Sequence, residues 1–308
     1  MRPRPPFWEG ERSRPIGRFL GHLPAAIGAS ILGVTLLVCL VAGGEPPGLQ
    51  GQNLEMRFLA PSFGHPLGTD ELGRDVVGRI LQGGRVSLVV GLVGALAGTL
   101  LGIAVGATAA LGGSLLDSLL MRLTDAFLAL PLLPLLIVLS AVDPAARLDR
   151  FLTAHGLVTA GPVGDSSLAN ILLLVALFGW MHTARVVRAT CLSLAGTEFV
   201  LAARVLGASA FRVVTRHILP NATAPILVAM TLGVGRVILY ESALSFLGLG
   251  IQPPVASWGN MLAGAQEALW RAPWLAISPG AMILLTVLAV NFVGDGLQEA
   301  CDPGGRPG

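Results

Sequence analysis

Long apolar runs alternate with polar stretches along this chain, and the apolar runs predict its fold. Each run is close to the roughly 20 residues with which a helix crosses the hydrocarbon core of a bilayer. We therefore predict an all-α, polytopic membrane protein with six transmembrane helices. The expected spans cover residues 25–43, 86–111, 123–142, 168–184, 221–247 and 273–294.

These spans divide the chain into successive segments. An N-terminal segment (1–24) and a C-terminal tail (297–308) flank them. The first span is followed by a long connection (44–85), in which we expect an interfacial helix. The remaining five spans form a core (86–296) that contains its own polar connection (185–220). An even number of spans places both termini on the same side of the membrane.

The composition also favours a bilayer environment. Hydrophobic residues make up 53% of the chain and charged residues only 12%, whereas soluble domains carry roughly 25% charged residues. A soluble fold could not bury so much apolar surface. The net charge of +2 is small and the basic residues are dispersed. We therefore expect membrane lipid, and no nucleic acid, as a partner.

All 20 basic residues are arginines, and the chain contains no lysine. A phosphate-binding P-loop needs its lysine to reach the β- and γ-phosphates, so any ATP hydrolysis must belong to a partner. Basic loops tend to remain in the cytoplasm. With the N-terminus inside, twelve arginines lie in cytoplasmic segments, seven lie outside and Arg236 falls within a span. This distribution places both termini in the cytoplasm.

Residue types with catalytic or metal-binding chemistry do not form a recognisable set. The cysteines (Cys39, Cys191 and Cys301) lack metal-ligand spacing, and the five histidines are dispersed. We expect neither a metal site nor a disulfide. There is no His-Glu-x-x-His motif, and the sequence alone assembles no catalytic triad. We predict a chain without catalytic residues and without a bound cofactor.

Glycines and prolines inside the spans indicate how the helices pack. Glycine recurs at every fourth position of the second span, which leaves one helix face bare for another helix to approach. These residues are Gly94, Gly98, Gly102 and Gly106. Pro131 and Pro134 should kink the third span and free carbonyls that must face protein or a water-filled cavity. The kink is either a structural bend or part of a helix that lines a pathway.

Two charged residues fall inside the fifth span, where charge is costly and often functional. Arg236 lies deep in this span and Glu241 lies near its outer end. Five positions separate them, so their side chains do not share one helix face. Each either pairs with another helix or faces the pathway. The pathway candidates are therefore Arg236, Glu241, Pro131 and Pro134.

The polar connection 185–220 predicts a helix, a bend and a second helix lying against the membrane. Thr197 is placed to cap the first helix, with Glu198 at the positive end of its dipole. A low apolar surface follows, formed by Ala202, Ala203, Val205 and Leu206. Gly207 should end this helix and Ser209 should cap the next.

The stretch before the second span predicts the interfacial helix. Asp70 is placed to cap it, and Asp75 and Arg79 have the spacing of an i,i+4 ion pair. Its apolar face would consist of Leu72, Val76, Val77, Ile80 and Leu81.

Three motifs resemble those of a known transporter family. Residues 198–209 (EFVLAARVLGAS), followed by 216–221 (RHILPN), resemble the EAA loop of bacterial ABC importer permeases. Residues 65–75 (HPLGTDELGRD) and 241–250 (ESALSFLGLG) are similar to the second permease subunit of dipeptide, oligopeptide and nickel importers. The last motif continues with Pro253, Pro254, Ser257, Trp258 and Gly259.

The resemblance implies a type I importer permease with MetI-like architecture and assigns roles to residues. The ATPase-coupling residues would be Glu198, Leu201, Ala202, Ala203, Arg204, Gly207, Ala208, Ser209, Leu219 and Pro220. The external family motif would comprise Gly68, Thr69, Asp70, Gly73, Arg74, Asp75 and Arg79. Leu201 departs from the family, because it stands where the EAA triplet opens with a glutamate that contacts the ATPase.

The resemblance also implies partners and a function. This chain would pair with a homologous second permease, two ABC ATPase subunits and an extracytoplasmic substrate-binding protein in the prokaryotic cytoplasmic (inner) membrane. It would form half of the solute pathway and couple hydrolysis of ATP, used with Mg²⁺ by the partner subunits, to uptake of peptides or a related small solute. The alternatives are a permease of the same class for nickel or another solute, an ion-coupled secondary transporter and a membrane-embedded enzyme. The scarcity of intramembrane carboxylates argues against the secondary transporter.

Overall fold

The computed structural model describes residues 21–42, 52–154 and 166–301, together with Gly17 and Phe19. Over these ranges the chain folds into helices joined by turns, so the fold is all-α. Most of the predicted segment 1–24, the middle of the connection between the third and fourth predicted spans (residues 155–165) and the end of the predicted tail 297–308 lie outside the described residues.

Five helices are each long and apolar enough to cross a membrane. They are α2 (Leu23–Ala42), α3 (Val76–Leu111), α7 (Ser166–Ala195), α10 (Thr223–Phe246) and α12 (Trp274–Cys301). The third predicted span consists of two helices, α4 (Gly113–Ala129) and α5 (Leu132–Val142), bent by 88° at the break. Counted as one broken span, this pair brings the number of candidate spans to the six that we predicted.

The break between α4 and α5 follows from the two prolines. Leu130 ends α4 in an extended conformation (φ −78°, ψ 138°), the region that a following proline favours. Pro131 precedes the first residue of α5, and Pro134 lies in its first turn, where a missing N–H breaks no intrahelical bond. The predicted kink is therefore present, as a complete interruption of the helix.

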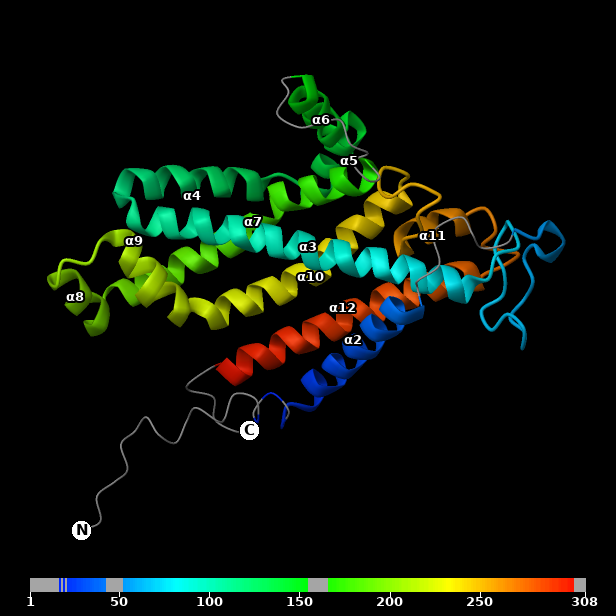
Figure 1. The fold of residues 1–308 in the computed structure, drawn as a ribbon, viewed down its shortest axis with the longest axis horizontal. Coiled ribbons are helices and arrows are strands. Elements are labelled where there is room, and N and C mark those ends of the chain that lie inside the picture. Colours follow the sequence, from blue (N-terminus) through cyan, green and yellow to red (C-terminus); the bar gives the residue numbers. More distant parts are fainter. Residues whose placement is uncertain (1–16, 18, 20, 43–51, 155–165, 302–308) are drawn as a thin grey trace, which may run out of the picture.

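The two helices that contact each other most extensively, α3 and α7, run side by side through the bundle (Figure 1). A Cβ atom on Gly98 would lie 3.1 Å from the backbone of Gly179, and one on Gly102 would lie 2.6 Å from the Cβ of Thr183. Glycine allows the backbones to approach this closely. The prediction of a bare helix face is confirmed. On the other sides, α10 packs against α3 and α12, and α2 packs against α12.

Shorter elements lie at the two ends of the bundle (Figure 1). One end carries α8 (Glu198–Val205), α9 (Ala210–Val213), the π-helical turn η2 (Val214–Ile218) and η3 (Leu219–Ala222). The start of α2 and the end of α12 point toward this end. The other end carries η1 (Leu54–Met56) and α11 (Trp258–Ala265), while α6 (Pro144–Ala154) follows α5. Residues Leu219 and Pro220 thus lead into α10, as predicted.

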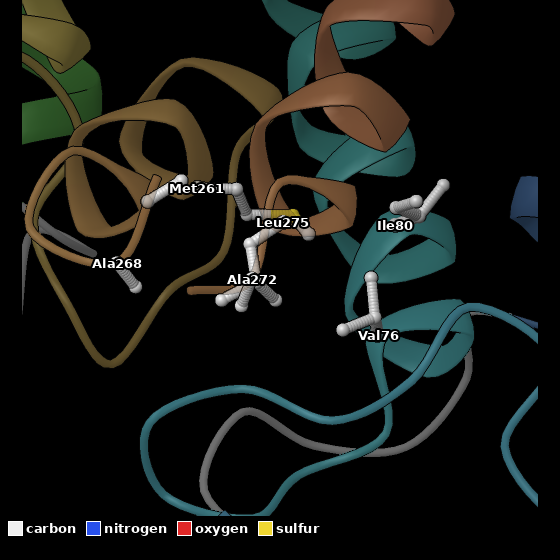
Figure 2. Close-up of a cluster of buried hydrophobic side chains, with 7 residues drawn as sticks. Val76, Ile80, Met261, Ala268, Ala272 and Leu275 are labelled. Atoms are coloured by element: carbon white, nitrogen blue, oxygen red, sulfur yellow. The ribbon is translucent and has the colours of Figure 1, made fainter. Parts of the chain in front are cut away.

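Buried apolar clusters attach these elements to the spans. At the end of the bundle that carries α11, one cluster packs α11 against the starts of α3 and α12 (Figure 2). Its buried members are Val76, Ile80, Met261, Ala265, Ala268, Ala272 and Leu275. A second cluster joins α8, α9 and η2 to α7. Its buried members are Val187, Cys191, Val200, Val213, Val214 and Ile218.

Two predicted boundaries are wrong. The described part of 44–85 contains no separate interfacial helix, because α3 begins at Val76 and continues uninterrupted to Leu111. The expected amphipathic helix is thus the first turns of the second span. Likewise, α7 does not end at residue 184 but continues to Ala195, so the first third of the predicted connection 185–220 belongs to the span helix.

Candidate functional site

The outer face of α8 is apolar and exposed. On the inner side of this helix, Val200 and Ala203 are buried, and Val200 packs in a cluster with Val187 and Cys191 of α7. The side chains that face away from the bundle are Leu201, Val205 and Leu206. Phe211 of the next helix, α9, is also exposed. Val205 and Leu206 are each 87% exposed. Glu198, Ala202 and Arg204 are exposed as well.

Both ends of α8 lie where the sequence predicted. Of the two predicted side-chain caps in this connection, the one from Ser209 forms and the one from Thr197 does not. Thr197 precedes the helix, yet its hydroxyl donates to the Leu194 carbonyl and caps no helix N–H. At the other end, the N–H of Ala208 donates to the Ala203 carbonyl at 3.0 Å and that of Gly207 donates to the Arg204 carbonyl at 2.9 Å. This Schellman turn requires a left-handed residue, and Gly207 has φ +81°. The Ser209 hydroxyl then caps α9 as predicted.

The charged residues of the segment before α3 converge on Asp70. Its buried carboxylate accepts bonds from the Arg74 Nε at 2.7 Å and the Arg79 Nη1 at 2.8 Å. It also accepts from the backbone N–H groups of Leu72 and Arg74, each at 2.9 Å. Asp70 therefore closes a turn and does not cap a helix. Arg79 pairs with Asp70 and not with Asp75, so both predictions were wrong.

The helix cap belongs to Asp75, which accepts the Gly78 N–H at 3.0 Å and contacts His65 Nδ1 at 3.1 Å. Gly68 and Gly73, with φ +74° and +72°, fold the chain back so that Asp70 reaches both arginines. The buried Thr69 hydroxyl donates to the Met56 carbonyl. The seven motif residues are thus brought together, beside a cavity of about 270 Å³ that also borders α11.

Glu241 of α10 is completely buried and heavily hydrogen-bonded. Its carboxylate accepts from the hydroxyls of Ser245 at 2.8 Å, Ser87 at 3.1 Å and Ser242 at 3.4 Å. Ser87 of α3 in turn accepts the backbone N–H of Trp258, the first residue of α11, at 3.2 Å. The carboxylate therefore connects α3, α10 and α11.

Arg236 of α10 lies where two cavities meet, together with His182 of α7. The smaller cavity, about 140 Å³, has Phe127, Phe178 and Tyr240 in its wall. The larger one, about 720 Å³, carries Asn291 and Gln298 of α12. Neither wall contains an aspartate or a glutamate. Arg236 is therefore a cation on the wall of two cavities whose other lining residues are largely apolar.

The remaining pathway candidates occupy other positions. Pro131 and Pro134 are exposed, and neither lines the three cavities described above, although Leu130 and Leu132 beside the break line the smallest. Glu241 lines none of the three either. In the described ranges no group of three or more His, Cys, Asp or Glu side chains is arranged to hold a metal ion.

Sequence reasoning missed two ion pairs between α4 and α7, and it missed the position of His182. Arg188 binds Asp117 through both carboxylate oxygens, at 2.5 and 2.6 Å, and Arg185 pairs with Asp125. Both arginines fall within the predicted polar connection 185–220, whereas in the structure they belong to α7. The available signal was two isolated acids in the largely apolar stretch that forms α4 and α5.

A bundle of helices long enough to span a membrane, with cavities among them and an exposed short helix at one end, is the architecture of a membrane component of a transport system. The chain belongs to the family of binding-protein-dependent transport system inner membrane components, whose model matches residues 98–306. The predicted class, an ABC importer permease with MetI-like fold, is confirmed.

Curated relatives cover nearly the whole chain. It is 37% identical over 302 residues to a putative peptide permease protein of Brucella suis biovar 1, with 97% of this chain and 93% of the relative covered. It is 37% identical over 298 residues to a putative peptide transport system permease protein of Brucella abortus biovar 1, with 93% and 90% covered. The dipeptide transport system permease protein DppC of Alkalihalophilus pseudofirmus is 38% identical over 251 residues, with 82% and 76% covered. The chain is thus a permease subunit and a multi-pass membrane protein.

Proposed function

We propose that this chain forms half of the translocation pathway of an ATP-driven peptide importer. It pairs with a homologous second permease, two ATPase subunits hydrolyse ATP with Mg²⁺, and an extracytoplasmic binding protein delivers the solute. This chain binds no cofactor of its own. The names of the three relatives, all peptide or dipeptide permeases, support peptides over nickel as the solute.

The proposed location is the cytoplasmic membrane of a prokaryote, with α8, α9 and both termini inside. The first residues of α2 and the last residues of α12 point toward the end that carries α8 (Figure 1). The exposed residues Arg204, Arg212 and Arg216 lie at the same end, in agreement with the tendency of basic loops to stay in the cytoplasm.

The outer face of α8 carries the argument for coupling to an ATPase. Val205 and Leu206 are almost fully exposed at the end of the molecule that we assign to the cytoplasm. Exposed apolar side chains gathered on one short helix are typical of a protein contact. We assign this face to the ATPase, with Leu201 supplying an apolar contact where related permeases supply a carboxylate.

The inner face of α8 explains how motion reaches the pathway. Val200 is buried with Val187 and Cys191 of α7, and α7 is packed against the glycine face of α3. A displacement of α8 by the ATPase therefore moves α7 and α3 together. Rigid-body motion of this kind is a common way to turn a pathway from one side of a membrane to the other.

The experiment combines binding and uptake. The double variant Val205→Glu, Leu206→Glu is compared with Trp270→Glu, a site that is also highly exposed (97%) and lies at the opposite end. We expect the double variant to insert but to lose co-purification of the ATPases and uptake of a labelled dipeptide by at least about tenfold. Trp270→Glu should retain ATPase co-purification. Normal uptake by the double variant would refute the docking face, and a wild-type complex without peptide uptake would refute the peptide assignment.

Orientation is tested separately with cysteine labelling. Phe63, in the turns between η1 and α3, is fully exposed. The native Cys39 and Cys191 are buried, and Cys301 is replaced by serine in both variants. A membrane-impermeant maleimide should label Phe63→Cys in intact spheroplasts, and Val205→Cys only after permeabilisation. The reverse pattern would invert the proposed topology.

A further inference from the structure

Arg236 is a charged residue that has no counter-ion among the residues the structure describes. Across the described ranges it takes part in no ion pair and no side-chain hydrogen bond. It lies about 20 Å along α10 from Thr223, at about 1.5 Å per residue, and so near the middle of this 24-residue helix. The guanidinium group of arginine is a cation. The cost of this position calls for a function.

Glu241 does not neutralise Arg236, although both lie on α10. Five residues turn the helix by about 140° beyond a full turn, so the two side chains leave different faces. The Glu241 carboxylate is occupied by three serine hydroxyls between α3, α10 and α11. Arg236 instead lines the two cavities.

The cavity walls around Arg236 suit an anion. They contain no carboxylate, and His182 is the only other residue with a basic side chain in either wall. Asn291 and Gln298 add amide groups on the α12 side. Small residues on the same helix, Ala229 and Gly233, leave space beside the guanidinium. The larger cavity, about 720 Å³, can hold a short peptide segment.

We propose that Arg236 binds the C-terminal carboxylate of the peptide as it passes through the bundle. This inference rests on the proposed peptide function and names the chemical group that this chain recognises. A guanidinium binds a carboxylate through two parallel hydrogen bonds, which a neutral amide cannot reproduce. The aromatic wall of the smaller cavity, at Phe127, Phe178 and Tyr240, receives an adjacent apolar side chain.

The test uses the complete transporter with its binding protein in proteoliposomes. The probes are the tripeptide Ala-Phe-Ala, its C-terminal amide and the amide of Ala-Asp-Ala, each at a concentration that saturates the binding protein. Saturation equalises delivery, so the acid-to-amide ratio of uptake rates reports the permease. We expect a ratio of about ten in the wild type, which corresponds to about 1.4 kcal/mol, and about one in Arg236→Gln. The Asp-containing amide should behave like the neutral amide.

Controls separate binding from structure. Arg122→Gln removes an exposed arginine of α4 that lies outside both cavities, and it should leave the ratio at its wild-type value. Where Arg236→Gln does not assemble, Arg236→Lys decides, because lysine keeps the charge but loses the two-pronged geometry. A lowered ratio supports the proposal and an unchanged ratio overturns it.

Three other results would overturn the proposal. They are an unchanged ratio in Arg236→Gln, an equal loss for acid and amide, and rapid Arg236-dependent uptake of the Asp-containing amide. Failure of the wild type to take up any of the probes would instead refute the peptide function itself.

Discussion

The hydroxyl of Ser87 donates a hydrogen bond of 3.1 Å to the carboxylate of Glu241, although 154 positions separate the two residues in the chain. The same Ser87 oxygen accepts the backbone N–H of Trp258. Hydrogen bonds in such apolar surroundings are stronger than in water, and they depend on every member being paired. This network holds the first half of α3, the second half of α10 and the start of α11 as one unit.

Removal of the carboxylate should therefore loosen this end of the bundle. In Glu241→Ala, three serine hydroxyls lose their acceptor, and one unpaired buried group alone costs about 1–3 kcal/mol. We expect a lower melting temperature of the purified protein in detergent, with Glu241→Gln between wild type and Glu241→Ala. The exposed Glu267→Ala serves as the control. Equal melting of Glu241→Ala and Glu267→Ala would contradict the network.

Sequence patterns predicted the features that depend on neighbouring positions. The spans follow from runs of apolar residues, and the close contact of α3 and α7 follows from glycine at every fourth position. The end of α8 follows from Gly207, because few other residues adopt its positive φ. Each of these features is determined by residues that are close together in the sequence.

Features that depend on distant partners could not be predicted in the same way. Asp70 and Asp75 are equally good caps in sequence, and the turns at Gly68 and Gly73 decide between them. Proline predicted a bend after Leu130, but the 88° angle also depends on the packing of α5, whose Leu136 is buried with Leu174 and Leu244. The hydrogen bond between Ser87 and Glu241 could not be predicted either, because 154 positions separate the two residues.

The contact between α3 and α7 should not tolerate a single methyl group. A Cβ on Gly102 would lie 2.6 Å from the Thr183 Cβ and 2.8 Å from the Trp180 carbonyl oxygen, where about 3.5–4.0 Å is the preferred separation of carbon atoms. Gly102→Ala should destabilise the protein by about 1–3 kcal/mol, seen as a lower melting temperature. Gly33→Ala in α2 has open space around it and should melt like the wild type. A Gly102→Ala variant as stable as Gly33→Ala would show that the helices can separate without cost.

The turn before α3 should depend on Asp70. In Asp70→Asn, Arg74 and Arg79 lose the carboxylate that both bind within 2.8 Å, and a partly buried cation without its partner is destabilising. We expect faster trypsin cleavage after Arg57 and Arg74 in the purified protein. Glu71→Gln changes the adjacent exposed carboxylate and should leave the cleavage rate unchanged. Indistinguishable digestion of the two variants would mean that the glycine turns alone hold the segment.

The Schellman turn at Gly207 should set the efficiency of coupling. Open space surrounds a Cβ at this position, so a larger side chain conflicts only with the backbone at φ +81°. A left-handed conformation costs a branched residue about 1–2 kcal/mol, and proline would also remove the N–H that donates to Arg204. Gly207→Val and Gly207→Pro should therefore displace the outer face of α8 and lower the number of peptides taken up per ATP hydrolysed.

Two further substitutions make this measurement specific for backbone conformation. Gly207→Asn should lose less, because asparagine adopts positive φ more readily than other residues. Gly196→Val, in the turn before α8, also meets open space but does not have a positive φ, so its coupling should equal that of the wild type. The α8 turn would have no part in coupling if the Gly207→Pro complex retained the wild-type ratio of uptake to hydrolysis. An equal loss in Gly207→Val and Gly196→Val would assign the effect to side-chain bulk in this connection and not to the geometry of the turn.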